Sequence, residues 1–398
     1  MNRVVITSCV RTPIGLFGKS LKTVSAIDLG AAVIEESLKR SNLSGKEVSE
    51  VLFGCAIQSG LGQNVARQCA IKAGLPEYVP ATTVNQVCGS GLRSVSLAYQ
   101  LIKSGDSDII LAGGTENMSQ APLTLKNTRF SGQQNNIETI DEIQSALSDG
   151  LQGFKMGMTA ENLADKFKIS REKQDQLAFL SHIKAKRAQD EGLLSAEICP
   201  ILINKESNTY LSNDETIVRN VTPEHFSGLT PLFKDGGSVT AGNSSGINDG
   251  AAAVVLMSEQ KALELGVPIM AEIKGIGQAG VDPSIMGFSP VMAIKEAVNK
   301  TNIHLDQIDL FEINESFAAQ MIAVAQGLRE EGVGEVPFEK LNVNGGSIAL
   351  GSPVGSSGCR ILVTLLHEMK RSKKRTGLAA ICAGGGIGTA IITQNYAA

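Results

Sequence analysis

The stretch TTVNQVCGSGLRSVSLAYQLIKSGDSDIILAGG, residues 82–114, predicts a strand, a helix and a second strand in direct succession. The apolar runs at 82–88 and 108–114 are strand-like, and the segment 90–105 between them is helical in character. The helix is expected to end at Gly105, because glycine is favoured just beyond a helix. Apolar strands that alternate with helices are typical of a parallel sheet covered on both faces. The chain is therefore predicted to be an α/β protein.

The same alternation extends in both directions from this stretch. Ser25 and Asp28 have the spacing of a capping box at the start of the first helix. The other expected strands lie at 3–10, 51–57, 248–258, 268–277, 309–314 and 378–385, and the other expected helices lie at 25–40, 62–74, 290–302, 315–328 and 359–371.

The two halves of the chain echo each other. VNQVCGSG (84–91) precedes a helix and a strand that ends in LAGG (111–114), and GSPVGSSG (351–358) precedes a helix and a strand that ends in CAGG (382–385). This order indicates a duplicated α/β unit whose equivalent loops meet at one site. Between the halves the chain is more charged and irregular, as in an inserted loop or lid domain. The predicted boundaries are 1–118 plus 243–271 for the N-terminal half, 119–242 for the insertion and 272–398 for the C-terminal half.

Composition excludes several classes of function. The 398 residues are 42% hydrophobic and 19% charged, with a net charge of −4 and no Trp. There is no basic patch with interleaved aromatic residues, so no nucleic-acid partner is expected. The seven cysteines are scattered and form no CxxC pair, which argues against a disulfide framework and against any metal site, and is typical of a cytoplasmic protein. The first residues, MNRVVITSCVRTP, are too polar for a signal peptide.

The C-terminal tail has two interpretations. The basic run KRSKKR (370–375) precedes an uncharged segment, residues 377–398, that is long enough for a membrane anchor. However, Gly384–Gly386 and Gly388 divide it into two short apolar runs. Two buried strands joined by a glycine turn, with no membrane partner, are the favoured prediction.

Three residues at strand ends are candidates for chemistry. Cys88 precedes a helix, whose N-terminus stabilises a thiolate, although a buried cysteine is more often structural. Cys382 precedes AGGGIG, a loop whose free N–H groups suit an oxyanion hole, and the alternative is a plain glycine hairpin. Asn314 begins NESFA; it is suited to holding a water or a carbonyl, or equally to capping the next helix.

A serine hydrolase is a remote alternative. GNSSG (242–246) matches the nucleophile-elbow pattern GxSxG with Ser244 at its centre, and His304 and His367 are the nominal partners. The elbow requires a helix after the serine, whereas INDGAAAVVLM predicts a turn and a strand. Neither the dinucleotide pattern GxGxxG nor the phosphate-loop pattern GxxxxGK[ST] occurs.

The whole chain resembles the thiolase family, and most closely its acetoacetyl-CoA (acetyl-CoA C-acetyltransferase) type. The blocks that carry the resemblance, in the family's order and spacing, are NQVCGSGL, AGGTENMSQAP, TAGNSSGINDGAA, NESFAA, NVNGGSIALGSPVGSSG and CAGGGIG. The resemblance implies a five-layered α/β/α/β/α fold built from two mixed-sheet halves and an inserted loop domain. It also implies an acyl-CoA substrate, no metal or redox cofactor, and a homotetramer or homodimer.

By the same resemblance, Cys88 is the acylated nucleophile, Cys382 is the acid and base, and Asn314 holds a water near the thioester oxygen. Thiolases use these groups to condense two acetyl-CoA molecules or to cleave acetoacetyl-CoA. The residues that would contact the substrate are Ser245 at the pantetheine, Met156, Met286 and Phe317 at the acyl end, and Arg219, which lies about one residue from the position of the family's phosphate-binding arginine.

Two positions depart from the family pattern. Thiolases read GHP where this chain reads GSP, so Ser352 replaces the histidine that takes the proton of the nucleophilic cysteine. Lys155, in GFKMGMTAEN, replaces the histidine of the HMG block. Loss of a general base typically lowers a rate by about 10²–10⁴.

These departures leave three hypotheses for the function. The chain is an active acetyl-CoA C-acetyltransferase that tolerates Ser352, a thiolase-like protein with altered or much reduced chemistry, or an acyl-CoA binder without turnover. The presence of Cys88, Cys382 and Asn314 together favours the first two hypotheses.

Overall fold

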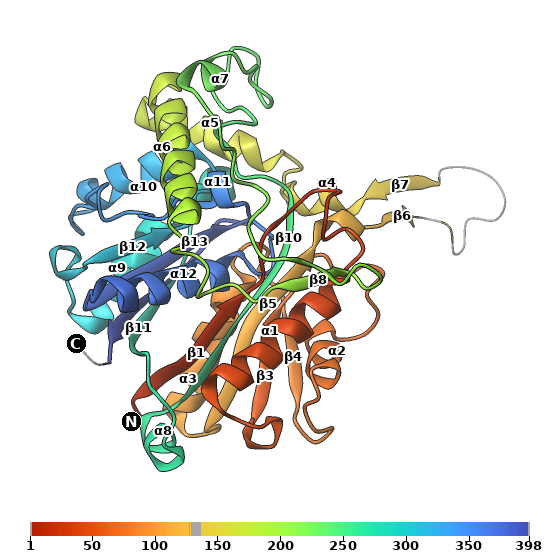
Figure 1. Ribbon diagram of the computed structural model, residues 1–398. Coiled ribbons are helices and arrows are strands. Elements are labelled where there is room, and N and C mark those ends of the chain that lie inside the picture. Colours follow the sequence, from red (N-terminus) through yellow and green to blue (C-terminus); the bar gives the residue numbers. More distant parts are fainter. Residues whose placement is uncertain (1, 127, 129–136, 397–398) are drawn as a thin grey trace.

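The computed structural model describes residues 2–126, 128 and 137–396 (Figure 1). The N-terminal half contains β1 (Val4–Arg11), β2 (Gly15–Leu16), α1 (Ala26–Ser41), β3 (Glu50–Gly54), α2 (Val65–Lys72), β4 (Ala81–Val84), α3 (Ser90–Ser104), β5 (Ile109–Asn117) and β10 (Asn248–Ser258). Between β5 and β10 lie β6 (Leu123–Lys126), β7 (Glu138–Asp141), α4 (Glu142–Ala146), α5 (Met156–Phe167), α6 (Arg171–Asp190), β8 (Ile201–Asn204), β9 (Thr209–Leu211) and α7 (Pro223–Ser227). After α8 (Glu259–Leu265), the C-terminal half contains β11 (Ala271–Gly280), η3 (Pro283–Phe288), α9 (Ser289–Thr301), β12 (Leu310–Ile313), α10 (Ala318–Glu330), α11 (Ser347–Leu350), α12 (Ser357–Ser372), β13 (Thr376–Ala383) and β14 (Ile387–Asn395).

The strand order supports the predicted duplication. The N-terminal half pairs its strands in the order β1-β10-β5-β3-β4, and the C-terminal half follows with β11-β14-β13-β12. The two series join where Val5 and Ile6 of β1 pair with Glu272 and Ala271 of β11. In the N-terminal half, β1 pairs with β10, and β10 pairs with β5. In the C-terminal half, β11 pairs with β14, and β14 pairs with β13.

The prediction of a parallel sheet is only partly correct. β3 is parallel to β4 and to β5, and β12 is parallel to β13. The pairs made by β1, β10, β11 and β14 are antiparallel, so the sheet is mixed. The physical reason is that two parallel neighbours must be joined by a crossover connection, usually a helix. β14 instead returns from β13 through a tight turn, and β10 follows the long insertion after β5.

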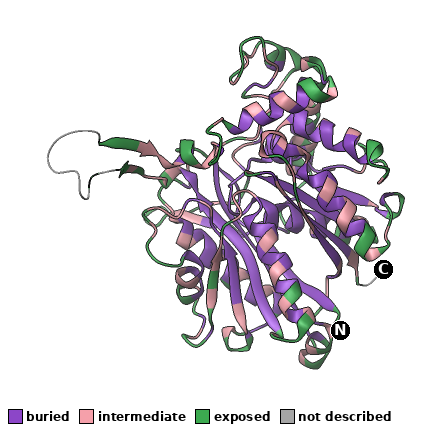
Figure 2. Cartoon of the chain, turned by 180° about the vertical axis from the view of Figure 1, so that it is seen from behind, coloured by how far each residue is buried: buried purple, intermediate pink, exposed green. Residues whose placement is uncertain are grey.

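Five layers result from the packing of helices on these strands. α3 and α12 contact each other and strands of both halves, so they form the central layer. α1 and α2 cover the outer face of the N-terminal strands, and α9 covers the outer face of the C-terminal strands. Most strands of this sheet are buried along their length, as the view from behind shows (Figure 2), and β4 at its edge is partly exposed. The arrangement is the α/β/α/β/α fold that the resemblance implies.

Local signals in the sequence account for several element ends. Ser25 Oγ accepts a hydrogen bond from Asp28 N (3.0 Å), which caps α1 as predicted. The tail forms the antiparallel pair β13 and β14, and Gly385 and Gly386 make the turn, each with φ of +80°. The prediction of two buried strands is thus confirmed. Within the described ranges, no helix is long and apolar enough to cross a membrane.

The loop before α12 is seated directly on the ends of β3 and β5. Glu116, at the end of β5, accepts hydrogen bonds from Ala56 N (2.9 Å), Ile57 N (3.2 Å) and Gly355 N (2.8 Å). A Cβ atom at Gly114 would lie 2.1 Å from Gly355 O, so only glycine permits this approach. The buried carboxylate therefore links the N-terminal half to the loop of the C-terminal half.

The starts of α3 and α12 also meet backbone to backbone. A Cβ at Gly91 would lie 2.8 Å from Cys359 N, and a Cβ at Gly358 would lie 2.6 Å from Leu92 N. These two glycines occupy equivalent places in the duplicated loops CGSG and GSSG. The close and reciprocal contact brings the two helix N-termini, and hence the two loops, to one place.

Glu116→Gln is expected to destabilise the fold. Both carboxylate oxygens accept backbone N–H groups, so a glutamine amide must turn its own N–H toward one of those donors. We expect a loss of about 2–3 kcal/mol in the free energy of unfolding, the cost of a buried donor left without an acceptor. Urea unfolding would measure it, with Glu206→Gln at an exposed position as the control. Equal stability of the two variants would contradict the anchoring role of Glu116.

Candidate active site

Cys88 lies in a strained turn between β4 and α3. The strand that we predicted at 82–88 ends at Val84, because Val87 has a φ of +50°, a left-handed conformation that is costly for a β-branched residue. Ser90 Oγ accepts from Gln86 N (2.9 Å) and donates to Val87 O (2.6 Å), which holds the turn closed. The turn places the thiol at the N-terminus of α3.

The surroundings of Cys88 favour its neutral form. Cys88 is half-buried, and desolvation of its sulfur is the main cause that raises the pKa of this thiol to about 12; the neighbouring Cys382 raises it further. Hydrogen bonds from the backbone N–H groups of Cys88 itself and of Gly384 act in the opposite direction. The sulfur thus lies beside two backbone donors, one from each half of the molecule, but without a nearby cation.

Cys382, at the end of β13, forms the centre of an apolar cluster. The side chains that pack with it are Met156 at the start of α5, Met286 in η3, Phe154 and Phe317. Burial raises the pKa of Cys382 to about 11, and the hydrogen bond from Ser316 opposes this rise. The structure therefore brings together three residues, Met156, Met286 and Phe317, that the sequence assigned to the acyl end of the site.

Asn314 reaches Cys382 through a residue that the sequence analysis missed. Asn314 is buried and donates from Nδ2 to Ser316 Oγ (2.9 Å), which lies 3.4 Å from Cys382 Sγ. Ser245 N donates to Ser316 O (3.0 Å), so the predicted pantetheine contact lies beside the same residue. Its place in the block NESFA, two residues after Asn314, is the signal that could have found Ser316.

Ser352 is buried and its hydroxyl is committed elsewhere. Ser352 Oγ lies 2.8 Å from Ser357 Oγ, whose own proton is donated to Pro353 O (2.8 Å). The proton of Ser352 is therefore the one shared between the two serines. Its backbone N donates to Asn248 Oδ1 (2.9 Å). Ser352 belongs to the loop that carries Val354, which packs against Cys88, but nothing in these contacts makes it a base.

Lys155 and Arg219 point to other partners. Lys155 is exposed and its Nζ contacts Gln144 of α4. Arg219 is 67% exposed and lies 3.9 Å from Asp190. Their assignments as substrate contacts remain predictions.

A cavity of about 560 Å³ lies next to the loop that carries Ser245. Its walls include Ser244, Gly246 and Ile247 of this loop, and His182 of α6. His182 is buried, and its Nδ1 has no hydrogen-bond partner among the described residues. Ile247 also packs in the cluster that contains Cys88, whereas Cys88 itself is not among the described residues that line the cavity.

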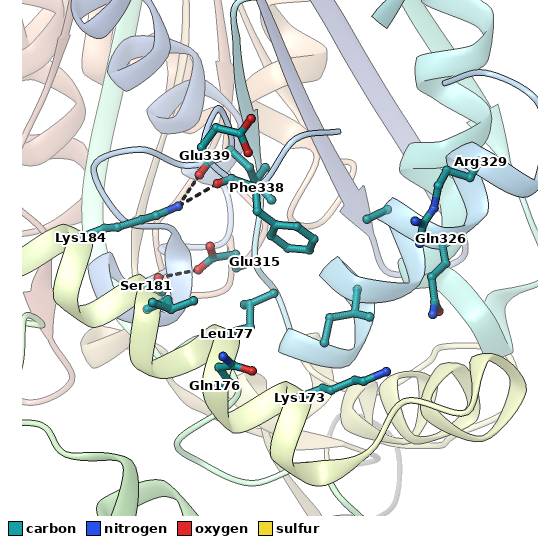
Figure 3. Close-up of a pocket in the computed structure, with 14 residues that line it drawn as sticks. Lys173, Gln176, Leu177, Ser181, Lys184, Glu315, Gln326, Arg329, Phe338 and Glu339 are labelled. Carbon is teal, nitrogen blue, oxygen red and sulfur yellow. Dashed lines mark hydrogen bonds between the residues drawn. The ribbon is translucent and has the colours of Figure 1, made fainter. Parts of the chain in front are cut away.

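A second cavity, of about 530 Å³, lies between α6 and α10 (Figure 3). Glu315 lines it and accepts a hydrogen bond from Ser181 Oγ (2.7 Å), as Figure 3 shows. The described residues around this cavity include neither Cys88 nor Cys382.

The serine hydrolase alternative lacks its geometry. Ser244 Oγ donates to Thr240 O (2.7 Å), and the chain continues into the strand β10 rather than into a helix. His367 Nε2 lies 3.1 Å from Cys9 O, and His304 is an exposed residue before a short turn. Ser244 therefore has neither the elbow nor the partners that the alternative requires.

Comparisons with known proteins agree on one family. The model of the "Thiolase, N-terminal domain" matches residues 4–260, and that of the "Thiolase, C-terminal domain" matches residues 267–395. An acetyl-CoA acetyltransferase of Syntrophomonas wolfei is 50% identical over 98% of both chains. A probable acetyl-CoA acyltransferase of Staphylococcus aureus is 49% identical over 100% of both chains. The crystal structure of the Bacillus anthracis acetyl-CoA acetyltransferase, 42% identical, superposes with a TM-score of 0.95 over 99% of both chains.

The pH dependence of Cys88 reactivity follows from its surroundings. Because burial raises the pKa of Cys88 far above neutral pH, the thiolate fraction rises with pH throughout the neutral range. We expect the rate of Cys88 alkylation by iodoacetamide to increase about tenfold per unit between about pH 7 and about pH 9. Mass spectrometry of the modified peptide would measure it, with Cys88→Ser as the control. A plateau below about pH 8 would indicate an activated thiol and contradict this prediction.

Proposed function

The chain belongs to the thiolase family, and from that premise we propose that it is an acetyl-CoA C-acetyltransferase acting through an acyl-Cys88 intermediate. The observation that carries the proposal is the convergence of Cys88 and Cys382, one from each half, beside the backbone donors of Cys88 and Gly384. The reaction is the condensation of two acetyl-CoA molecules to acetoacetyl-CoA, or the reverse thiolysis.

In the first step, the sulfur of Cys88 attacks the thioester carbonyl. The acetyl group passes from the sulfur of CoA to that of Cys88, and the thiol proton passes to the departing CoA. The two N–H groups beside Cys88 are suited to stabilise the negative charge that develops on the carbonyl oxygen. One thioester replaces another, so the covalent intermediate lies close in energy to the substrate.

In the second step, the thiolate of Cys382 removes a proton from the methyl group of a second acetyl-CoA. The resulting carbanion attacks the acyl-Cys88 carbonyl, and the sulfur of Cys88 leaves and regains a proton. Asn314 is connected to Cys382 through Ser316, because Asn314 Nδ2 donates to Ser316 Oγ and Ser316 Oγ contacts Cys382 Sγ. This route uses the substrate's CoA and no metal or redox cofactor.

We place the CoA portion of the substrate in the cavity beside Ser245. Met156, Met286 and Phe317 surround Cys382 and would contact the acyl end. The cavity beside Ser244 and Ile247 has a volume suited to the longer, polar part of CoA, with Lys19 at its wall as a cation for the phosphates.

A second candidate is a thiolase with reduced condensation or with transfer to another acceptor. The observation that favours it is the position of Ser352, whose proton is shared with Ser357 while the pKa of Cys88 is raised. Without a base next to Cys88, acylation proceeds through the small thiolate fraction.

We also propose that the protein assembles as a homotetramer or homodimer in the cytoplasm. The β6–β7 hairpin extends away from the body of the molecule (Figure 1). It exposes Leu123 (67%), Leu125 (58%) and the nearby Ile137 (63%), which a partner copy would cover. β4 is an edge strand with a partly exposed face. The seven free cysteines are consistent with a reducing compartment.

Acylation of Cys88 tests the proposal directly. Incubation with acetyl-CoA is expected to add one acetyl group to the peptide that contains Cys88, because the turn and both backbone donors are in place. Mass spectrometry after rapid acid quenching would detect it, and Cys88→Ser is the matched control. An unmodified Cys88 would leave only the binding function.

Ser352→His tests the importance of the missing base. A histidine at this position is the family pattern, and it would accept the proton of Cys88. We expect thiolysis of acetoacetyl-CoA to increase by about 10² or more, and the pH dependence of Cys88 alkylation to flatten. Ser352→Asn, which adds bulk without a base, is the control. An unchanged thiolysis rate in Ser352→His would show that the absence of a histidine at this position does not limit the reaction.

A further inference from the structure

A continuous series of hydrogen bonds connects a buried arginine to Cys382. Arg360 Nη2 donates to Ser347 Oγ (2.5 Å), and Ser347 Oγ donates to Asn314 Oδ1 (2.6 Å). Asn314 Nδ2 donates to Ser316 Oγ (2.9 Å), which lies 3.4 Å from Cys382 Sγ. All five residues are buried, so water does not compete for these bonds.

The bonds have one consistent direction. Because Arg360 can only donate, Ser347 Oγ accepts a hydrogen bond from it. Ser347 Oγ in turn donates its own proton to Asn314 Oδ1. The amide of Asn314 then presents its N–H to Ser316, whose oxygen accepts it. The hydroxyl proton of Ser316 is then available to the sulfur of Cys382, and only this direction is possible once that sulfur is ionised and has no proton of its own.

Arg360 gives this series a positive end. The side chain is buried, and the one carboxylate within 4.0 Å among the described residues is Glu312, whose Oε2 lies 4.0 Å from Nη1. Glu197 and Asp214 also act on the guanidinium from farther away, and Arg11 opposes them. Within the described chain, Arg360 Nε and Nη1 have no hydrogen-bond partner. A guanidinium remains charged under all ordinary conditions. A charge that is only partly compensated therefore lies at the far end, and it polarises every donor between itself and Cys382.

We propose that Arg360, Ser347, Asn314 and Ser316 form a directed donor series that stabilises the thiolate of Cys382. Ser316 is the terminal donor, and Ser347 and Arg360 are positioning residues that act through Asn314.

The inference rests on the proposed function, because it explains how Cys382 serves as the base of the second step. Burial opposes ionisation of this thiol, and the side chains packed against it from α5, η3 and the start of α10, among them Met156, Met286 and Phe317, carry no charge. The titratable group that faces it is Cys88, and two negative charges on the neighbouring sulfurs would oppose each other. Two features favour the thiolate of Cys382, the hydrogen bond from Ser316 and that from its own backbone N–H, and Ser316 is the side-chain donor of the two.

The test measures the reactivity of Cys382 toward hydrogen peroxide in a Cys88→Ser background. The thiolate attacks one peroxide oxygen, the sulfur is oxidised to the sulfenate, and the peroxide is reduced to water. The rate at a fixed pH near 8 reports the thiolate fraction of Cys382. Peptide mass spectrometry with a sulfenate trap measures this rate without any CoA substrate.

Ser316→Ala is expected to lower this rate about tenfold or more, because a hydrogen bond to an ionised group is lost. Ser316→Thr, which keeps the hydroxyl, should restore most of the rate. Ser347→Ala should give a smaller loss in the same direction. In the chain with Cys88 intact, Ser316→Ala should lower kcat of thiolysis while KM changes less than about twofold.

Each result separates this inference from the proposed function. An unchanged peroxide rate in Ser316→Ala, or an equal loss in Ser316→Thr, would overturn the donor series. Acylation of Cys88 by acetyl-CoA, measured on the same variants, tests the proposed function independently. If acetyl-CoA does not acylate Cys88 in the unaltered chain, the proposed acyltransferase function is refuted. The peroxide rates of the Ser316 variants would still decide whether Ser316 stabilises the thiolate of Cys382.

Discussion

The seating of the 351–358 loop on the ends of β3 and β5 is the contact on which the site depends. Glu116 receives Gly355 N together with Ala56 N and Ile57 N, so one carboxylate orders main chain from both halves. The carboxyl group of Glu116 is buried, and burial raises its pKa to about 7. This anchoring lets the N-termini of α3 and α12 meet at Gly91 and Gly358, so the loops that precede the two helices lie next to each other.

The duplicated halves contribute different chemistry to that space. The N-terminal half supplies Cys88, the proposed nucleophile, through a strained turn at Val87, whereas the C-terminal half supplies Cys382 from a regular strand end. The equivalent of the Cys88 loop, around Ser352, contributes hydrogen bonds among serines. The two halves therefore share a backbone arrangement but place chemically different side chains at equivalent positions.

Much of this arrangement could be predicted from the sequence, for identifiable reasons. Apolar runs and glycines located most strands and helices, and the ordered blocks singled out Cys88, Cys382 and Asn314, which the structure places near one another. The end of β4 could not be predicted, because the apolar run continues through Val87 while the backbone turns. The mixed character of the sheet depends on where β10 pairs after a long insertion, which no local pattern records. The exposed position of Arg219, 3.9 Å from Asp190, depends on how the insertion folds and not on a local pattern. The series of bonds through Ser316 depends on side-chain orientations from four separate segments.

The strand order also has a consequence for synthesis on the ribosome. β10 lies between β1 and β5, yet the chain must first complete the 119–242 insertion, and β14, the last strand, lies between β11 and β13. Each half is therefore closed only by its final strand, so open sheet edges persist while the nascent chain emerges. Because contacts between segments so far apart in the sequence form slowly, each half is expected to complete its sheet only after its final strand has been synthesised. The pairing of β10 and then of β14 thus fixes the topology of the two halves.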